Sequence, residues 1–344
     1  MSIVRWGLLS TANINQALIP AIRASRRGEL VAVTSRGKAK AQAYAQKWDI
    51  PQAFGSYQEM LDSGEVDAVY VGLPNHLHAE WSIKAMQAGV HVLCEKPFAH
   101  TLEEVDAMIA ARDKTGMVLA EAFMYRHHPQ TKIAGEWVRS GKLGEITLVR
   151  GAFDYYLPES QRQPDCLNVR LVPEWGGGCL WDVGVYPMSF AQFIMGGPPD
   201  WVFGSQRIGE TGVDEIFAGQ MGYDYQKLDF LKKSSFSTAQ ISCSFCTPFH
   251  TFIEIVGTEG RMYLTKPFVG LHEGREMTFY PKDGEPEEIL VPEVELYLGE
   301  VEDMHAAILD GEPNYLRLEE TRDHIKTVLA LYESARLGEV VSVQ

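Results

Sequence analysis

The chain has 344 residues, of which 45% are hydrophobic and 22% charged, a composition typical of globular proteins. Its net charge of -15 argues against a nucleic-acid partner, and no stretch has the roughly 20 apolar residues of a membrane span. The length suggests two domains. The first residues predict a strand and not a signal peptide, so we expect a cytoplasmic protein without a membrane partner.

The first 122 residues alternate between short apolar strands and helices. Strands are predicted at residues 3–10, 29–35, 66–72, 90–94 and 118–122, and helices at 13–27, 38–48, 76–88 and 101–114. Capping boxes open helices at Ser56 and Thr101. Pro20 should kink or end the first helix, and Gly28 should cap its C-terminus. The alternation predicts an α/β domain of Rossmann type, with a parallel sheet covered on both faces.

The second part of the chain, residues 123–344, changes character. Alternating segments at 146–155, 216–225, 236–245 and 251–256 predict a large, open, mainly antiparallel sheet in an α+β domain. Helices are predicted near 130–140, 187–195, 301–309 and 319–336. We assign dinucleotide binding to residues 1–122, and substrate binding and oligomerisation to 123–344. Because an exposed sheet face usually needs a cover, we expect a homodimer or homotetramer through that face.

The turn after the first strand reads Ser10-Thr11-Ala12-Asn13-Ile14. The dinucleotide fingerprint is G-x-G-x-x-G between a strand and a helix, and none of its three glycines is present. The small side chains of Ser10 and Ala12 and a free helix N-terminus still suit a pyrophosphate. An ordinary strand-to-helix connection fits the same residues, so this turn alone decides little.

The end of the second strand bears on the choice of cofactor. NAD-binding sites carry a carboxylate about 20 residues past the glycines, where it binds the ribose hydroxyls. Here the chain has Ser35 and Arg36, followed by Lys38 and Lys40, and no acid. A hydroxyl and a guanidinium suit a 2′-phosphate. We therefore expect NADP(H) in preference to NAD(H), the structural alternative being a solvated helix start.

Glu95-Lys96-Pro97 follows the apolar strand that ends at Cys94, at the edge where such sheets bind ligands. Pro97 keeps Lys96 out of helical geometry. A lysine held there can donate a hydrogen bond to a substrate oxygen and lower the pKa of a nearby acid. Glu95 could orient Lys96 or the nicotinamide ribose. The structural alternative is a surface lysine.

A glycine run at 176–178 precedes Asp182 and Tyr186. Three glycines allow the backbone to approach another group closely. If the segment is helical, Asp182 and Tyr186 share a face. A tyrosine can exchange a proton in an alcohol–ketone interconversion if Lys96 stabilises its phenolate. The structural alternative is a glycine-rich loop leading into a helix with a packed tyrosine.

The five cysteines do not predict a disulfide framework, because their number is odd and the chain looks cytosolic. Cys243 and Cys246 form a single C-x-x-C in an alternating segment. A redox motif would begin a helix, and a zinc site would need a second pair. We interpret both cysteines as strand residues and expect no metal.

Several motifs together resemble one known family. They are the start 6–14, Leu73-Pro74-Asn75-His76-Leu77-His78, Glu95-Lys96-Pro97, residues 121–126, and Gly177-Gly178 with Asp182 and Tyr186. The chain resembles the family of glucose–fructose oxidoreductase, inositol dehydrogenase and rhizopine-catabolism proteins. The resemblance implies that Lys96 is catalytic. Many members have histidine where this chain has Tyr186, and the tyrosine branch tends to use NADP.

The leading hypothesis is reversible hydride transfer between NADP(H), or NAD(H), and a hydroxyl or carbonyl of a sugar-like substrate. Lys96, Tyr186 and Asp182 are the expected catalytic residues. The expected cofactor-binding residues are Ser10, Thr11, Ala12, Asn13, Ile14, Ser35, Arg36, Lys40, Leu73, Pro74, Asn75, His78, Glu95, Lys96 and Pro97. The expected substrate-binding residues are Phe123, Tyr125, Arg126, His127, Asn168, Arg170, Asp182 and Tyr186. The alternatives are a ketoreductase acting on a nucleotide-linked deoxysugar and a non-catalytic, ligand-sensing regulator.

Overall fold

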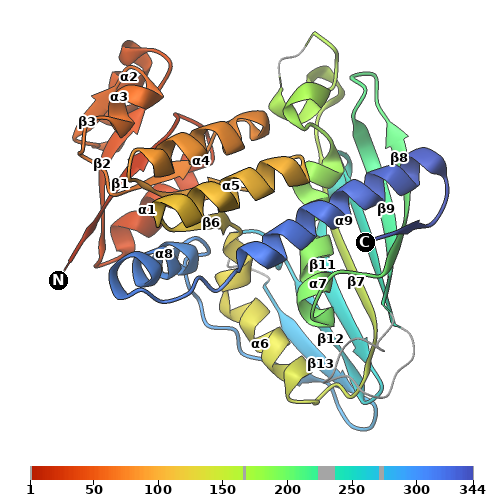
Figure 1. Cartoon of the computed structure of the whole chain (residues 1–344). Helices are drawn as coiled ribbons and strands as arrows, with labels where there is room; N and C mark the ends of the chain where they lie inside the picture. The colour runs from red at the N-terminus through yellow and green to blue at the C-terminus, as the bar shows by residue number, and fades with distance from the viewer. Residues whose placement is uncertain (1, 166–167, 224–236, 271–274, 344) are drawn as a thin grey trace. The chain divides into compact units, whose positions relative to one another are not determined.

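The computed structural model describes residues 2–165, 168–223, 237–270 and 275–343 (Figure 1). The chain divides into two compact units, residues 1–127 with 294–322 and residues 128–293 with 323–344. The division expected at residue 122 did not include a return of the chain. In the structure, residues 294–322 belong to the first unit. The expected strand ends at Tyr225 and Phe236 lie outside the described residues.

A six-stranded sheet in the order β3-β2-β1-β4-β5-β6 forms the centre of the first unit. All of its neighbouring strands are parallel. The strands are β1 (Val4–Leu8), β2 (Gly28–Thr34), β3 (Gln52–Phe54), β4 (Ala68–Val71), β5 (His91–Glu95) and β6 (Leu119–Ala122). This order confirms the predicted Rossmann-type sheet. The edge strand β3 has no predicted counterpart, because three residues carry too little alternation.

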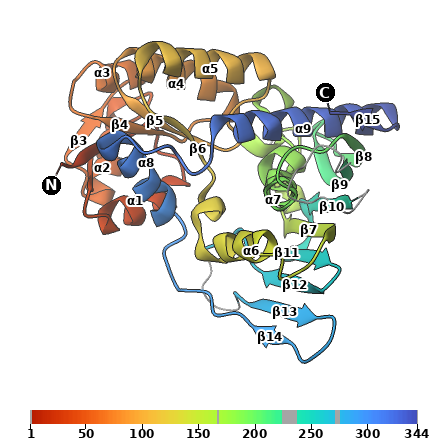
Figure 2. The same ribbon diagram turned by 60° about the horizontal axis from the view of Figure 1, so that its bottom comes forward.

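Helices cover both faces of this sheet. They are α1 (Asn15–Ala24), α2 (Lys38–Trp48), α3 (Tyr57–Leu61), α4 (His78–Gln87), α5 (Leu102–Thr115) and α8 (Leu298–Asp310). Figure 2 shows α4 and α5 on one face and α1 and α8 on the other. The capping box at Thr101 is complete. At Ser56 only half of it forms, because the Glu59 carboxylate accepts the N–H of Gly55 instead.

Two predictions for the first helix are wrong, its end at residue 27 and its cap at Gly28. The helix ends at Ala24 and contains Pro20, which therefore does not end it, while a kink at Pro20 stays a prediction. Gly28 begins β2 and does not cap the helix, since Ser25 already has an extended backbone. Packing explains the glycine, because a Cβ at Gly28 would lie 2.8 Å from Cε1 of His305.

The returning helix α8 is fastened to β1 through His305. The indole N–H of Trp6 donates to Nε2 of His305 over 2.9 Å, so the ring proton must sit on Nδ1, 3.1 Å from the Ser25 hydroxyl. Both ring systems are fully buried. Burial lowers the pKa of His305, while the nearby Glu302 carboxylate opposes this shift. The ring is therefore neutral near pH 7, and this tautomer joins two segments about 300 residues apart.

The second unit is built on a nine-stranded sheet in the order β14-β13-β12-β11-β7-β10-β9-β8-β15. The strands are β7 (Ile146–Tyr156), β8 (Trp201–Ile208), β9 (Asp214–Tyr223), β10 (Ser237–Ser244), β11 (Cys246–Gly257), β12 (Gly260–Thr265), β13 (Met277–Pro281), β14 (Glu287–Glu288) and β15 (Val341–Ser342). Among its pairs, β7 and β10 run parallel and the others antiparallel. The predicted, mainly antiparallel sheet is confirmed.

Among the described residues, helices cover one face of this sheet and leave the other open. The helices of this unit are α6 (Pro129–Arg139), α7 (Val185–Met195) and most of α9 (Leu318–Leu337). Gly151 faces α7, where a Cβ would lie 2.8 Å from Pro187, and Phe217 packs against Tyr332 of α9. Arg150, the next residue along β7, is exposed on the opposite face. Association of copies through this open face stays a prediction.

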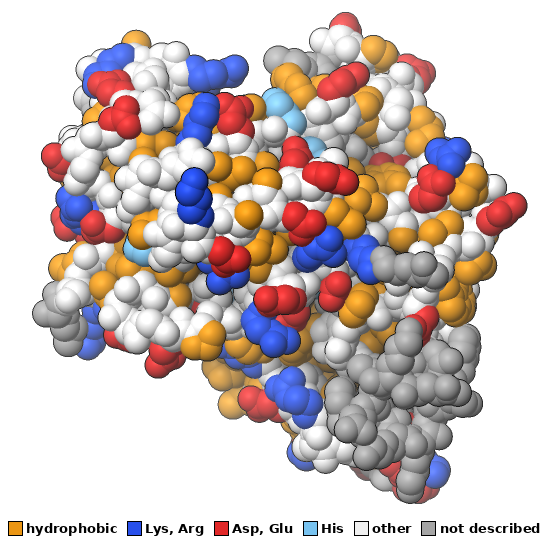
Figure 3. Space-filling view, in the orientation of Figure 1, with side chains coloured by type: hydrophobic (Ala, Val, Ile, Leu, Met, Phe, Trp, Pro, Cys, Tyr) orange, Lys and Arg blue, Asp and Glu red, His pale blue; other side chains and the backbone are white. Residues whose placement is uncertain are grey.

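Charge on the surface is mixed. In Figure 3, acidic side chains are interspersed among basic ones on the face shown. Within the part of the chain that the structure describes, no helix is long and apolar enough to cross a membrane. The same residues contain no group of three or more His, Cys, Asp or Glu side chains that could hold a metal ion.

The buried His305 predicts a stability that falls with acidification. Its folded-state pKa is depressed, so the unfolded chain takes up the proton first and unfolding becomes easier as pH falls below about 6.5. Each such histidine steepens the fall by up to about 1.4 kcal/mol per pH unit. We expect His305→Gln to flatten the dependence between pH 7 and 5.5, as measured by urea unfolding. His250→Gln, at an exposed position, is the control, and equal slopes for wild type and His305→Gln would contradict the prediction.

Candidate active site

The turn between β1 and α1 is held by side chains in place of glycines. The hydroxyl of Ser10 donates to the Gly72 carbonyl over 2.7 Å and accepts the N–H of Ala12 over 3.1 Å. The amide group of Asn15 donates to the Ser10 carbonyl over 2.8 Å. Among the described residues, the backbone N–H groups of Asn13 and Ile14 have no partner. They precede α1 at the carboxyl edge of the sheet, so the turn fits a pyrophosphate.

Positive charge follows β2 at the same edge. The Ser35 amide donates to the Phe54 carbonyl over 3.3 Å, which fixes the strand end. Arg36 and Lys40 are exposed, whereas Lys38 is paired with a carboxylate of α3 at 3.7 Å. The Arg36 guanidinium is thus accessible, whereas Ser35 is buried at the strand end. This arrangement fits an NADP 2′-phosphate better than bare ribose hydroxyls.

Glu95 and Lys96 lie at the carboxyl end of β5. Glu95 is buried, and its carboxylate accepts the Tyr70 hydroxyl on one oxygen and the Lys96 backbone N–H, at 3.0 Å, on the other. Burial raises the pKa of Glu95, and the Lys96 charge opposes that shift. Glu95 therefore orients the backbone of Lys96, one of the two roles expected for it, and Tyr70 of β4 in turn holds Glu95.

His78 begins α4 behind the same edge. Its Nδ1 lies 2.9 Å from the Pro97 carbonyl and its Nε2 lies 2.9 Å from the Leu73 carbonyl. The ring is fully buried, and burial lowers its pKa to about 4. The peptide between Lys96 and Pro97 is cis. His78 therefore contacts the two loops expected to bind the cofactor, and its own contact with the cofactor stays a prediction.

The predicted substrate residues of the first unit follow β6. Phe123, Tyr125, Arg126 and His127 are all buried. The rings of Phe123 and Tyr125 meet edge to face at 5.0 Å, and the Arg126 guanidinium lies 3.0 Å from a carboxylate oxygen of Glu320. These contacts are made within the first unit. Their role in substrate binding stays a prediction.

In the second unit, the glycine run allows a buried carboxylate to approach the backbone. Gly178 has a φ of 123°, and a Cβ there would lie 2.0 Å from Oδ1 of Asp214. The Asp214 carboxylate accepts the Leu180 N–H and the Tyr332 hydroxyl, each at 2.8 Å. A Cβ at Gly177 would lie 2.7 Å from the Arg170 carbonyl. The group that the glycines accommodate is therefore Asp214, together with the loop that carries Arg170.

Asp182 and Tyr186 occupy consecutive turns. Asp182 lies in a π-helical turn, Leu180–Gly184, that continues into α7, and Tyr186 is the second residue of that helix. Oδ2 of Asp182 accepts the Tyr155 hydroxyl at 2.8 Å and Nε of Arg170 at 2.9 Å. The Tyr186 ring packs against Phe153, with centroids 5.5 Å apart. The structure thus brings together Asp182 and Arg170, two of the predicted substrate residues.

A third predicted residue, Asn168, supports this arrangement. Its side-chain oxygen accepts the Arg170 N–H over 3.1 Å and begins a short 3-10 turn. Sequence reasoning missed Tyr155 and Asp214. Strand alternation could have placed Tyr155 on the same face as Phe153, but nothing local marks Asp214 as the partner of a segment 34 residues earlier.

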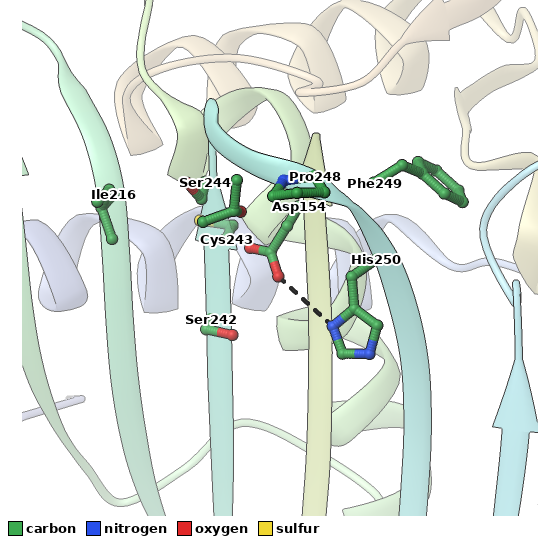
Figure 4. A pocket seen from close by; sticks show the side chains of 9 residues that line it. Asp154, Ile216, Ser242, Cys243, Ser244, Pro248, Phe249 and His250 are labelled. Carbon is green, nitrogen blue, oxygen red and sulfur yellow. Dashed lines mark ion pairs between the residues drawn. The ribbon is translucent and has the colours of Figure 1, made fainter. Parts of the chain in front are cut away.

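The cysteine pair lies on strands, as predicted. Cys243 is buried on β10, with its Sγ 3.5 Å from that of Cys179, and Cys246 begins β11. Cys243 also lines part of a separate recess of about 480 Å³. Asp154 and His250 face each other in this recess (Figure 4), with Oδ2 of Asp154 3.8 Å from Nδ1 of His250. Asp154 follows Phe153 along β7 and so faces the other side of the sheet. The recess therefore opens away from the face that carries Tyr186.

Comparison with known proteins supports the geometry. Residues 4–123 match the family model described as "Oxidoreductase family, NAD-binding Rossmann fold", and residues 131–263 match the GFO/IDH/MocA C-terminal domain. The chain belongs to the GFO/IDH/MocA oxidoreductase family. The predicted family is therefore confirmed, as is its NAD(P)-binding Rossmann domain.

Named relatives of this GFO/IDH/MocA chain are oxidoreductases. It is 36% identical to D-xylose 1-dehydrogenase (NADP(+)) 2 of Haloferax volcanii, over 98% of this chain and 99% of the relative. It is 33% identical to trans-1,2-dihydrobenzene-1,2-diol dehydrogenase of Danio rerio, over 75% and 73%. A 3-ketoreductase from Actinomadura kijaniata, solved with NADP and TDP-benzene, has 25% identity and a TM-score of 0.85 over 97% and 98%. The prediction of an enzyme acting on CH–OH groups is confirmed.

Gly178 should tolerate no side chain. We expect Gly178→Ala to lower the free energy of unfolding by about 3 kcal/mol or more, because it adds backbone strain and displaces Asp214 from its partners. Gly141→Ala is the control, since its φ is also positive but nothing lies within 4 Å of the added Cβ. That change should cost about 1–2 kcal/mol. Urea unfolding measures both, and equal costs would show that Asp214 is not the constraint.

Proposed function

We propose that this protein is an NADP(H)-dependent oxidoreductase that transfers a hydride to or from a sugar or sugar-like substrate. Lys96 and Tyr186 serve the transfer of the proton. The observation that carries the proposal is the position of Lys96 at the carboxyl end of β5, with its backbone held by the buried Glu95. Ligands bind at this edge in parallel α/β sheets.

The chemistry divides between the cofactor and the protein. The nicotinamide, when bound, supplies the hydride chemistry. Lys96 carries a positive charge suited to a hydrogen bond with the substrate oxygen that gains or loses the proton. Tyr186 offers a phenol that can exchange that proton with a hydroxyl. Asp182, whose Oδ2 is occupied by Tyr155 and Arg170, is fixed to orient the substrate.

The preference for NADP(H) rests on the end of β2. Arg36 and Lys40 are exposed there, and residues 35–40 contain no carboxylate that would favour ribose hydroxyls. The backbone N–H groups of Asn13 and Ile14 are available for the pyrophosphate. The NADP named in the xylose dehydrogenase relative agrees with this preference.

A second candidate is reduction of the ketone of a nucleotide-linked deoxysugar by the same residues. The likeness to the ketoreductase solved with TDP-benzene favours it. The two candidates are separated by a spectrophotometric screen with NADP and NAD. Turnover of free aldoses, polyols or trans-dihydrodiols supports the first, and turnover of a nucleotide-linked ketosugar alone supports the second.

Substitution of the proton-transfer residues tests the proposal directly. We expect Lys96→Met and Tyr186→Phe each to lower kcat by about 10²-fold or more, because each removes a group that acts in the transition state. Lys114→Met and Tyr156→Phe, at exposed positions, are matched controls that should keep wild-type kcat. Steady-state kinetics and melting temperatures are measured for all four.

The double variant adds a sharper criterion. If Lys96 and Tyr186 act on one proton, removing both should cost little more than removing the more important of them. Independent, multiplying losses would assign the two residues to different steps. Near wild-type kcat in both single variants would refute the catalytic assignment.

Arg36 should determine the cofactor preference. We expect Arg36→Ala to raise KM for NADP by about 10–100-fold and leave that for NAD nearly unchanged, because a charged hydrogen bond to the 2′-phosphate contributes about 1.5–3 kcal/mol. Lys38→Ala is the control, since Lys38 is paired with Glu59. If Arg36→Ala raises KM for NADP and for NAD by the same factor, Arg36 does not bind the 2′-phosphate.

A further inference from the structure

The ring of His78 lies between two backbone carbonyls, and a neutral ring cannot donate a hydrogen bond to both at once. Nδ1 is 2.9 Å from the Pro97 oxygen, and Nε2 is 2.9 Å from the Leu73 oxygen. A neutral imidazole has one N–H group and one nitrogen that only accepts. One carbonyl therefore receives a hydrogen bond, while the other faces a lone pair.

A doubly protonated ring would serve both carbonyls, but its surroundings oppose it. The ring is fully buried, and burial holds its pKa at about 4. The neighbouring Lys96 and His100 both disfavour a further positive charge. The ring is therefore neutral at pH 7, and the position of its proton decides which carbonyl is held.

The two carbonyls belong to loops with different tasks. Leu73 follows Gly72, whose carbonyl accepts the Ser10 hydroxyl of the nucleotide turn. Pro97 directly follows Lys96, whose own N–H is held by Glu95. One tautomer of His78 thus ties α4 to the nucleotide side, and the other ties α4 to the backbone that carries Lys96.

We propose that His78 is a positioning residue whose tautomer couples dinucleotide binding to the placement of Lys96. With the proton on Nδ1 the ring holds Pro97 and fixes Lys96 from its C-terminal side. With the proton on Nε2 it holds Leu73 instead. If a bound dinucleotide donated a hydrogen bond to the Leu73 carbonyl, that oxygen would depend less on the ring proton, and the Nδ1–H tautomer that holds Pro97 would be favoured. The inference rests on the proposed role of Lys96.

The position of the proton can be observed directly by ¹⁵N NMR of histidine-labelled protein at pH 7, with and without NADP⁺. The His78 signal is assigned by its loss in His78→Asn. We expect one protonated and one bare nitrogen in both states, with the Nδ1–H tautomer increasing when NADP⁺ binds. A ring protonated on both nitrogens, or a tautomer that NADP⁺ leaves unchanged, overturns the proposal.

Two amide variants imitate the two tautomers. The amide nitrogen of asparagine is as many bonds from Cα as Nδ1, and that of glutamine as many as Nε2. We expect His78→Asn to retain most of kcat, because it still donates to Pro97. His78→Gln should lose about 10²-fold in kcat, with KM for the sugar substrate nearly unchanged, because a misplaced Lys96 weakens the transition state most. Equal kcat in the two variants, or higher kcat in His78→Gln, overturns the proposal.

A buried control separates positioning from stability. His305 is also fully buried in the first unit but bonds to Trp6 and Ser25, away from both loops. His305→Gln should lower the melting temperature and keep kcat. If kcat follows melting temperature across all three variants, His78 has only a structural role. If Lys96→Met keeps wild-type kcat, the proposed function fails. If Lys96→Met is inactive while His78→Asn and His78→Gln have equal kcat, the proposed function stands and only this inference fails.

Discussion

Backbone groups at the carboxyl edge of a parallel sheet have no strand to pair with, and the first unit depends on how they are satisfied. Buried side chains supply the partners. Ser10 bonds to the backbone of Gly72, His78 donates to one of the two loop carbonyls beside its ring, and Glu95 accepts the N–H of Lys96. Each bond fixes irregular backbone from the side of the core. The outer side of these loops is thereby left for a ligand.

In the second unit, irregular backbone is also held by a buried side chain, the carboxylate of Asp214. Asp214 is buried at the start of β9, where burial raises its pKa, and its hydrogen bonds to Leu180, Cys179 and Tyr332 oppose that shift. It caps the π-helical turn that carries Asp182. Glycine at 178 is the condition for this contact, since any side chain would occupy the carboxylate's place. A buried structural acid thus positions the turn on which Asp182, the acid proposed to orient the substrate, lies.

Local pattern predicted the parts of the fold that local forces decide. The apolar strands and the capping box at Thr101 follow from neighbours in sequence. The partner of Trp6 is His305, almost the whole chain away, and no periodicity marks such a pair. The role of Gly28 was predicted wrongly for the same reason, a contact between residues far apart in the sequence. A side chain at Gly28 would collide with His305, so the glycine is explained by this contact and not by the end of α1. In the proposed site, motifs predicted Lys96 together with Glu95, and Asp182 together with Arg170, but missed Tyr155 and Asp214.

The net charge of -15 opposes the binding of a nucleic acid much more than the binding of a dinucleotide. A nucleic acid meets a wide surface, so it needs an extended basic face. A dinucleotide meets only a few groups, and salt screens charges beyond about 8 Å. In the proposed site, binding would depend on Arg36, Lys40 and the N–H groups of Asn13 and Ile14, and little on distant carboxylates. An acidic protein can thus bind an anionic cofactor through a short stretch of positive charge and oriented amides.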